Sequence, residues 1–313
     1  MSNEVLVMQP KEIEKVKVHY AQYKVERAAP GVVFAAKLSD TAITIYKSGK
    51  VMFQGNGASR EASLWGGISN NSKEKVISGT AKGDTLPPNF SSFSVVGSDE
   101  TGTGDYFGPI TVAACFVRAD QIELIQELGV KDSKMLTDDV MRKMAPDLMA
   151  TLTHSVLVLK NEKYNDIQGR GWSQGKIKAL MHNQALKHVL NKMNPEKPAY
   201  ILIDQFAERG IYYNHIKAEK EIIRENVLFS TKAEQLHVSV AAASIIARYA
   251  FLIEMDRLSK IANTTIPKGA SSKVDEIAAN IFLKHGETFL KSITKWHFAN
   301  TQKAIRIANK KRL

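Results

Sequence analysis

The stretch that most constrains the fold covers residues 93–117, FSVVGSDETGTGDYFGPITVAACFV. In it, a short apolar run is followed directly by two acids, Asp99 and Glu100, and then by a turn rich in glycine and a second apolar run. This pattern predicts a strand that carries the two acids to its end, a tight backbone turn and a return strand. Most of what the chain does depends on the role of these two acids.

Composition narrows the class of protein. With 313 residues, 44% of them hydrophobic and 24% charged, the chain is long enough for two domains and a sizeable core. Its single cysteine, Cys115, excludes an intramolecular disulfide and a cysteine-cluster metal site. No secretory signal is visible, and the longest apolar stretch, residues 238–253, is broken by Arg248 and is expected to be too short to cross a bilayer. We therefore expect a cytoplasmic protein.

The charge of the chain favours a polyanionic partner. The formal net charge is +11 and the isoelectric point is near 9.5. The last 23 residues hold seven Lys or Arg and no Asp or Glu. This tail is either a solvated basic terminus or a contact for a nucleic-acid backbone, and Trp296 and His297 beside the charges favour the second interpretation.

Residues 1–67 predict a small α+β domain. The expected elements are a helix at residues 10–24, strands at residues 32–37, 42–47 and 51–54, and a closing helix at residues 55–65. A small sheet in a basic unit suits either nucleic-acid binding or the docking of another protein, and both remain open. Residues 68–92 are rich in Ser, Asn, Gly, Lys and Pro, which predicts a linker.

Residues 93–313 predict an α/β fold in which helices pack on a central mixed sheet. Beyond the two opening strands, we expect strands at residues 155–160, 200–203 and 227–231 and helices at residues 121–128, 137–150, 173–193, 208–225 and 238–258. The remainder is expected to be helical, with breaks near Pro267 and Gly286.

Two further acids stand at comparable places. Asp204 ends the apolar strand AYILI, and Glu234 precedes the apolar helix SVAAASIIARY. Ligand sites gather at strand ends in α/β sheets, so these acids could converge with Asp99 and Glu100. Two carboxylates about 4 Å apart repel by about 4 kcal/mol at an effective dielectric constant of about 20, so such a group would take up protons or bind Mg²⁺ or Mn²⁺. Taken singly, each acid is more often structural, as a turn residue, a helix cap or a surface acid.

Gly102-Thr103-Gly104 forms a second element beside the acids. Two glycines around one residue let the backbone approach a ligand closely and point its N–H groups at it. A lone pattern of this kind is usually only a turn, but here any bound ligand would lie next to the acids.

The segment GSDETGTGDYFGP resembles the Asp-Glu-x-Gly-x-Gly segment of the type 2 ribonucleases H, and the chain looks most similar to the ribonuclease HIII branch. The resemblance extends through KDSKMLT, NEKYN, HNQAL, LIDQF and KAEQLHVSVAAASIIAR and covers most of residues 93–313. Residues 1–67 are similar in size, position and hairpin pattern to the TATA-box-binding-protein-like substrate domain of that branch. The resemblance implies a ribonuclease H-like catalytic domain preceded by this small domain.

The resemblance also implies roles for individual residues. It implies a metal-binding catalytic quartet of Asp99, Glu100, Asp204 and Glu234, where glutamate at the fourth place separates ribonuclease HIII from ribonuclease HII. It further implies two substrate-binding groups: Gly102, Thr103 and Gly104, which would read the ribose 2′-OH through the backbone, and Ser133 and Lys134, which would contact phosphates. His182, His237 and Cys115 are interpreted as structural.

The implied reaction is hydrolysis of the RNA strand of an RNA–DNA hybrid with two Mg²⁺ or Mn²⁺ ions, leaving 5′-phosphate and 3′-OH ends. Thr103 stands where ribonuclease HII usually has Arg or Lys, which disfavours cleavage at single embedded ribonucleotides. That activity, or a non-catalytic nucleic-acid-binding protein, remains the alternative. We expect a monomer with no membrane association and no obligate protein partner.

Overall fold

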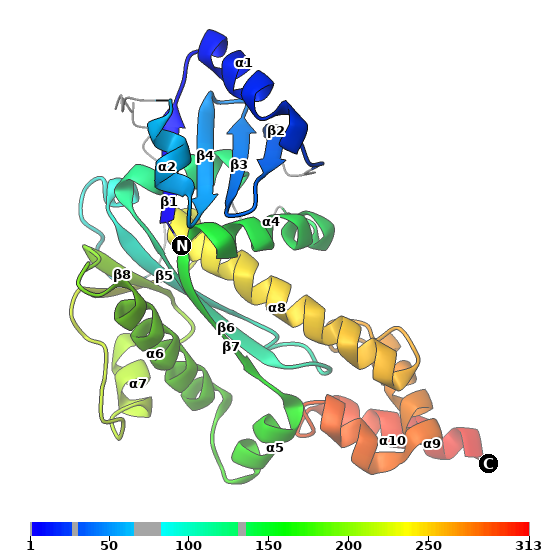
Figure 1. Ribbon diagram of the computed structural model, residues 1–313. Coiled ribbons are helices and arrows are strands. Elements are labelled where there is room, and N and C mark those ends of the chain that lie inside the picture. Colours follow the sequence, from blue (N-terminus) through cyan, green and yellow to red (C-terminus); the bar gives the residue numbers. More distant parts are fainter. Residues whose placement is uncertain (1, 27–30, 66–82, 131–135, 313) are drawn as a thin grey trace.

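The computed structural model describes residues 2–26, 31–65, 83–130 and 136–312, and Figure 1 shows their arrangement. This part of the chain forms two sheets. The smaller has the strand order β1-β4-β3-β2 and the larger the order β7-β6-β5-β8-β9. Helices flank both sheets, which confirms the expected α/β class (Figure 1).

The N-terminal domain is an antiparallel four-stranded sheet with two helices. Its elements are β1 (Ser2–Val7), α1 (Pro10–His19), β2 (Val32–Lys37), β3 (Thr41–Tyr46), β4 (Lys50–Gly55) and α2 (Ala58–Ser63). The three expected strands are confirmed, and β1 adds a fourth that was not predicted. The first helix ends five residues before the predicted residue 24, and a short 3₁₀ turn, Ala21–Tyr23, follows it.

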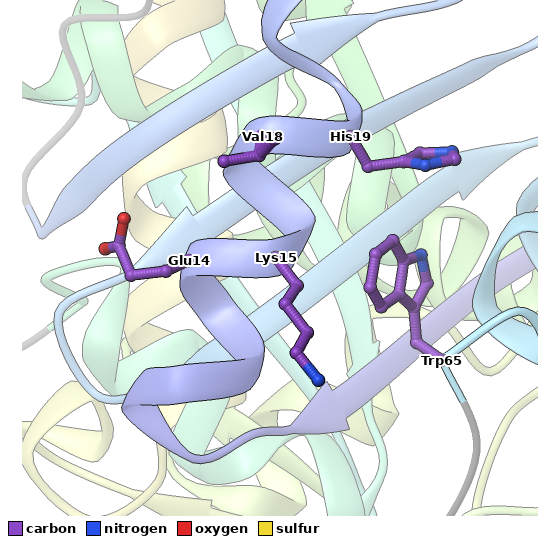
Figure 2. A pocket seen from close by; sticks show the side chains of 5 residues that line it. All are labelled: Glu14, Lys15, Val18, His19 and Trp65. Carbon is purple, nitrogen blue, oxygen red and sulfur yellow. The ribbon is translucent and has the colours of Figure 1, made fainter.

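Alternation along the strands gives this sheet two apolar faces. Ile43 and Ile45 of β3 pack with Val16 of α1 and Ala58 of α2 in one core. Side chains of successive strand residues point to opposite faces, so Tyr46 lies on the other side. The outer surface of α1 carries a hollow of about 510 Å³ lined by Glu14, Lys15, Val18, His19 and Trp65 (Figure 2).

The second face of the N-terminal sheet packs against the larger domain. Tyr46 and Met52 share a buried core with residues of α3 (Ile122–Glu127) and α4 (Asp138–Thr151). Lys50 forms an ion pair with Glu123 of α3 at 2.7 Å. The Gln54 amide nitrogen donates to the Thr151 hydroxyl of α4 at 2.9 Å. Helices thus cover both faces of the small sheet.

The larger domain is built on a mixed five-stranded sheet. Its strands are β5 (Val95–Thr101), β6 (Ile110–Val117), β7 (Thr153–Leu159), β8 (Tyr200–Asp204) and β9 (Val227–Ser230). β5, β6 and β7 pair antiparallel, whereas β8 and β9 run parallel to β5. β5 and β6 are the predicted strand and return strand.

Helices cover both faces of this sheet. Besides α3 and α4, they are α5 (Asn161–Gly169), α6 (Gln174–Met193), α7 (Arg209–His215), α8 (Val238–Ala262), α9 (Ser272–Ile293) and α10 (Ala299–Arg312). Ala113 and Cys115 of β6 face α4 and α8, whereas Val112 and Ala114 face α6. The helix predicted over residues 208–225 was wrong in length, because α7 ends at His215, and α5 was not predicted.

Helix α8 is longer than expected, at 25 residues. By length and composition it could cross a membrane, but 61% of its most apolar window is buried inside the protein. It runs along the sheet next to α4 (Figure 1). Its apolar character is accounted for by this packing, as in the core helix of an α/β domain.

Part of the segment predicted as a linker packs on the larger domain. Gly83 forms a β-bridge with Ser230, and Asp84 accepts hydrogen bonds from Arg209 and the Phe229 amide. Phe90 is buried in a small core beside β5. The rest of the predicted linker lies mostly outside the described residues, and the division at residues 67 and 92 stays a proposal.

Candidate active site

The parallel pairing of β5 and β8 places two acids side by side. Ser98 pairs with Ile203, so the next residues, Asp99 and Asp204, are neighbours at the same edge of the sheet. Asp99 lies inside β5 rather than after it, and Asp204 is the last residue of β8. The structure therefore brings together two of the four predicted acids by strand register alone.

The Asp99 side chain faces α8 and is only 8% exposed. Burial, followed by repulsion from Asp204 and Glu100, raises the pKa of Asp99 well above its usual range. Hydrogen bonds from Ser244 of α8 and from the Glu100 amide, at 2.6 Å to Oδ1, offset part of this effect. The surroundings of Asp99 thus favour the neutral form of its carboxyl over the charged form.

Glu100, the next residue of β5, points to the opposite face of the sheet, toward α6. Its Oε1 lies 2.7 Å from Lys178 Nζ and its Oε2 lies 2.9 Å from His182 Nε2. Burial favours the neutral acid, but His182 and then Lys178 outweigh it and lower the pKa of Glu100. Two adjacent acids therefore have opposite electrostatic environments, one that disfavours charge and one that stabilises it.

Glu234 lies in a short 3₁₀ turn, Ala233–Gln235, between β9 and α8. The residue is 6% exposed. The amide of the preceding residue, Ala233, donates to Asp204 Oδ1 at 3.0 Å, which ties the turn to the end of β8. Glu234 is therefore held at the same sheet edge as Asp204 rather than on a surface loop.

Asp99, Asp204 and Glu234 lie at one edge of the sheet while Glu100 points to its other face, and the four acids do not form a finished metal cage. Within the described residues, no group of three or more His, Cys, Asp or Glu side chains is arranged to hold a metal ion. The donor set nonetheless suits a hard divalent cation, because it consists of carboxylates and the buried Asp99 is destabilised by its acidic neighbours. A cation beside Asp99 and Asp204 would relieve that repulsion.

The glycine segment forms the turn from β5 to β6. Gly102 has φ 94° and a Cβ there would lie 2.2 Å from the Pro109 carbonyl oxygen, so this position requires glycine. At Gly104, a Cβ would have no atom within 4 Å, so the backbone there is open to a ligand. Thr103 lies between them and its carbonyl accepts from Gln174 of α6 at 3.0 Å.

Lys295, from the basic tail, anchors this turn from beneath. It is fully buried, and its Nζ donates to the carbonyls of Asp105 at 2.7 Å and Gly108 at 2.6 Å. Burial lowers the pKa of Lys295 to about 7. Lys295 is therefore neither a solvated residue of the tail nor available to contact a nucleic-acid backbone, because its ammonium is turned into the protein.

Ser133 and Lys134, the predicted phosphate contacts, lie outside the described residues. Cys115 is buried and contacts only the protein interior, and His237 caps α8 by accepting from the Ser239 amide. The interpretation of His182 as merely structural was too narrow, since it binds Glu100. Lys178 was missed altogether. The sequence signal that could have identified Lys178 together with His182 is their spacing of four residues, which places both on one face of α6.

Comparison with known proteins agrees with this architecture. The family model described as "Ribonuclease HII" matches residues 96–301, and the one described as "Domain of unknown function (DUF3378)" matches residues 3–78. The ribonuclease HIII of Lysinibacillus sphaericus is 65% identical over 306 residues, covering 97% of this chain and 99% of that protein. The ribonuclease HIII of Bacillus subtilis is 50% identical over 313 residues, covering both chains fully.

Solved structures show the same relationship. The crystal structure of Bst-RNase HIII in complex with Mn²⁺ is 44% identical and superposes with a TM-score of 0.70 over 99% of this chain and 100% of that chain. Aquifex aeolicus RNase H3, at 21% identity and a TM-score of 0.53, shares the fold. Identity of 50–65% along the whole length, together with these matches, shows that the chain belongs to the ribonuclease HIII family of type 2 ribonucleases H.

Proposed function

We propose that this protein is an endonuclease that hydrolyses the RNA strand of RNA–DNA hybrids. The observation that carries the proposal is the pair Asp99 and Asp204, which lie side by side on adjacent parallel strands, with half-buried Asp204 repelling buried Asp99. Membership in the ribonuclease HIII family supports the same activity. The expected products carry 5′-phosphate and 3′-OH ends.

In this proposal, Asp99, Glu100, Asp204 and Glu234 hold Mg²⁺ or Mn²⁺. Carboxylate oxygens are preferred ligands of these ions, and the repulsion around Asp99 gives the protein a reason to bind them. The related Bst-RNase HIII has been solved with Mn²⁺. Two such ions, when bound, activate a water and stabilise the leaving oxygen of a phosphodiester. The protein supplies no nucleophile of its own.

The remaining residues bind and orient the hybrid. The backbone at Gly104 is open, so the Gly102-Thr103-Gly104 turn is placed to approach a ribose and read its 2′-OH next to the acids. Ser133 and Lys134 are proposed to contact phosphates, on the basis of resemblance alone. Thr103 in the middle of the turn favours hybrids over single embedded ribonucleotides, and a duplex with one ribonucleotide tests that preference directly.

The N-terminal domain is proposed to add affinity for the hybrid. Helices cover both faces of its sheet in this structure. The face that packs on α3 and α4 would therefore reach a hybrid only by separating from these two helices. Comparing the hybrid KM of the full chain with that of a chain starting at Gly83 tests this role, and an unchanged KM would contradict it. We further propose that the enzyme is a cytoplasmic monomer.

The assignment of the acids is tested by Asp99→Asn and Asp204→Asn. Each variant is expected to lose cleavage of a labelled hybrid by a factor of about 10³ or more while still binding it. Asp120→Asn, which changes an exposed acid paired only with Arg118, is the matched control and should cleave normally. Near-normal turnover by either active-site variant would refute the assignment.

A further inference from the structure

Two protein side chains, one of them an ammonium, already contact both carboxylate oxygens of Glu100. Lys178 Nζ contacts Oε1 at 2.7 Å and His182 Nε2 contacts Oε2 at 2.9 Å. The ion pair is enclosed, since the side chains of Glu100 and Lys178 are only 12% and 10% exposed. Charge-assisted hydrogen bonds of this kind are among the strong ones, so Glu100 is held in place rather than free to rotate.

A second layer of contacts fixes Lys178 and His182 themselves. The Lys178 ammonium lies 4.2 Å from the centre of the Phe206 ring, in a cation–π contact. The His182 ring stacks on Phe206 at 5.1 Å, and its Nδ1 lies 2.6 Å from the Ser98 hydroxyl. Because His182 Nε2 donates to the carboxylate, Nδ1 accepts from Ser98 when the ring is neutral. Phe206 follows Asp204 by two residues, so the same strand end supplies an acid and the aromatic ring that contacts both Lys178 and His182.

We propose that Lys178 is a positioning residue that acts as an internal counter-cation for Glu100 and limits the affinity of the site for divalent metal. The inference rests on the proposed function, in which Glu100 is a metal ligand. A metal ion that binds Glu100 must either share the carboxylate with the Lys178 ammonium or displace the ammonium. The positive charge of Lys178 also repels the ion. Metal binding is therefore weaker with Lys178 present, and Glu100 reaches an incoming ion from a defined orientation.

Lysine is suited to this role because its flexible stem lets the ammonium retreat along the Phe206 ring without leaving it. Lys178 and His182 hold the Glu100 carboxylate in a fixed orientation before metal arrives. Lys178 and His182 are four residues apart, so one face of α6 provides both partners of Glu100.

The test is Mn²⁺ binding to the full-length, metal-free protein, measured by calorimetry without substrate. Lys178→Met should bind Mn²⁺ at least about tenfold more tightly, since loss of one charge in contact with a ligand oxygen exceeds the 1.4 kcal/mol that corresponds to tenfold. Lys178→Arg keeps the charge and should stay close to wild type. Lys176→Met, which removes a lysine of the same helix that lies over Trp172, is the matched control and should not change the affinity.

If Lys178→Met folds poorly, a second variant and a second measurement still test the proposal. Lys178→Gln can still donate a hydrogen bond to Glu100 and should also bind Mn²⁺ more tightly, with a larger rise in melting temperature on adding Mn²⁺ than wild type shows. Unchanged or weaker Mn²⁺ binding in both Lys178 variants, or an equal change in Lys176→Met, would overturn the proposal. Failure of the wild-type protein to bind Mn²⁺ or to cleave hybrids would instead refute the proposed function.

Discussion

Replacing Asp99 by Asn should stabilise the metal-free protein while abolishing its activity. Neighbouring strands lie about 4.8 Å apart, and two unit charges at about 5 Å repel by about 3 kcal/mol at an effective dielectric constant of about 20. Asn keeps the shape of Asp99 and an oxygen that accepts from the Glu100 amide. Partial protonation of Asp99 relieves some of the repulsion in the wild type, so the expected gain in free energy of unfolding is about 1 to 3 kcal/mol.

The gain should depend on pH in a defined direction. The pKa of Asp99 in the folded protein is above its ordinary value of 3.8, so above that pH the folded state binds more protons than the unfolded state. The contribution of Asp99 to the stability of the wild type therefore falls as pH rises through this window, and the advantage of Asp99→Asn should be largest near neutral pH and vanish near pH 4.

Urea unfolding in the presence of a chelator measures the effect, with Asp120→Asn as the control that removes an exposed acid. Adding Mn²⁺ should make the wild type more stable than Asp99→Asn, because Mn²⁺ binding stabilises only the protein that retains the Asp99 carboxylate. An Asp99→Asn variant that is less stable than wild type without metal at pH 7 would show that the two acids do not repel as inferred.

Three further predictions concern residues that hold the site in place. Burial lowers the pKa of His237 to about 4 from 6.5, so stability should fall by up to about 3 kcal/mol as pH drops from 6.5 to 4, and His237→Asn should flatten this slope in pH-dependent unfolding. Lys295→Met should raise the hybrid KM about tenfold with a smaller change in kcat, because the glycine turn loses its anchor. Lys197→Met, which removes an exposed lysine outside the basic tail, is the control, and wild-type kinetics in Lys295→Met would contradict this prediction. Gly102→Ala should lower the free energy of unfolding by about 2 kcal/mol or more through strain at φ 94°, whereas Gly104→Ala should fold normally yet cleave hybrids poorly, and normal cleavage by the second variant would remove the turn from the substrate site.

Local sequence patterns predicted much of the catalytic domain. The apolar runs on either side of the glycine turn became β5 and β6, and Thr137 caps α4 where the pattern Thr-Asp-Asp predicted a helix start. The prediction failed where local signals were weak. The segment after His215 contains enough charged residues to suggest a helix, yet α7 ends there. Ile216, Ile222 and Ile223 still pack against the core of the sheet, but they do so without continuing the helix.

The sequence by itself determined that acids stand at strand ends beside a glycine turn, because strand alternation and turn chemistry are local properties of the chain. Only the tertiary structure decided that Asp99 and Glu100, adjacent in sequence, face opposite sides of the sheet and meet different partners. Lys178 reaches Glu100 across 78 positions of sequence, and Lys295 reaches Gly108 across 187. Such pairings depend on which helix face packs on which sheet face, and that is settled by the burial of the whole core rather than by any single segment.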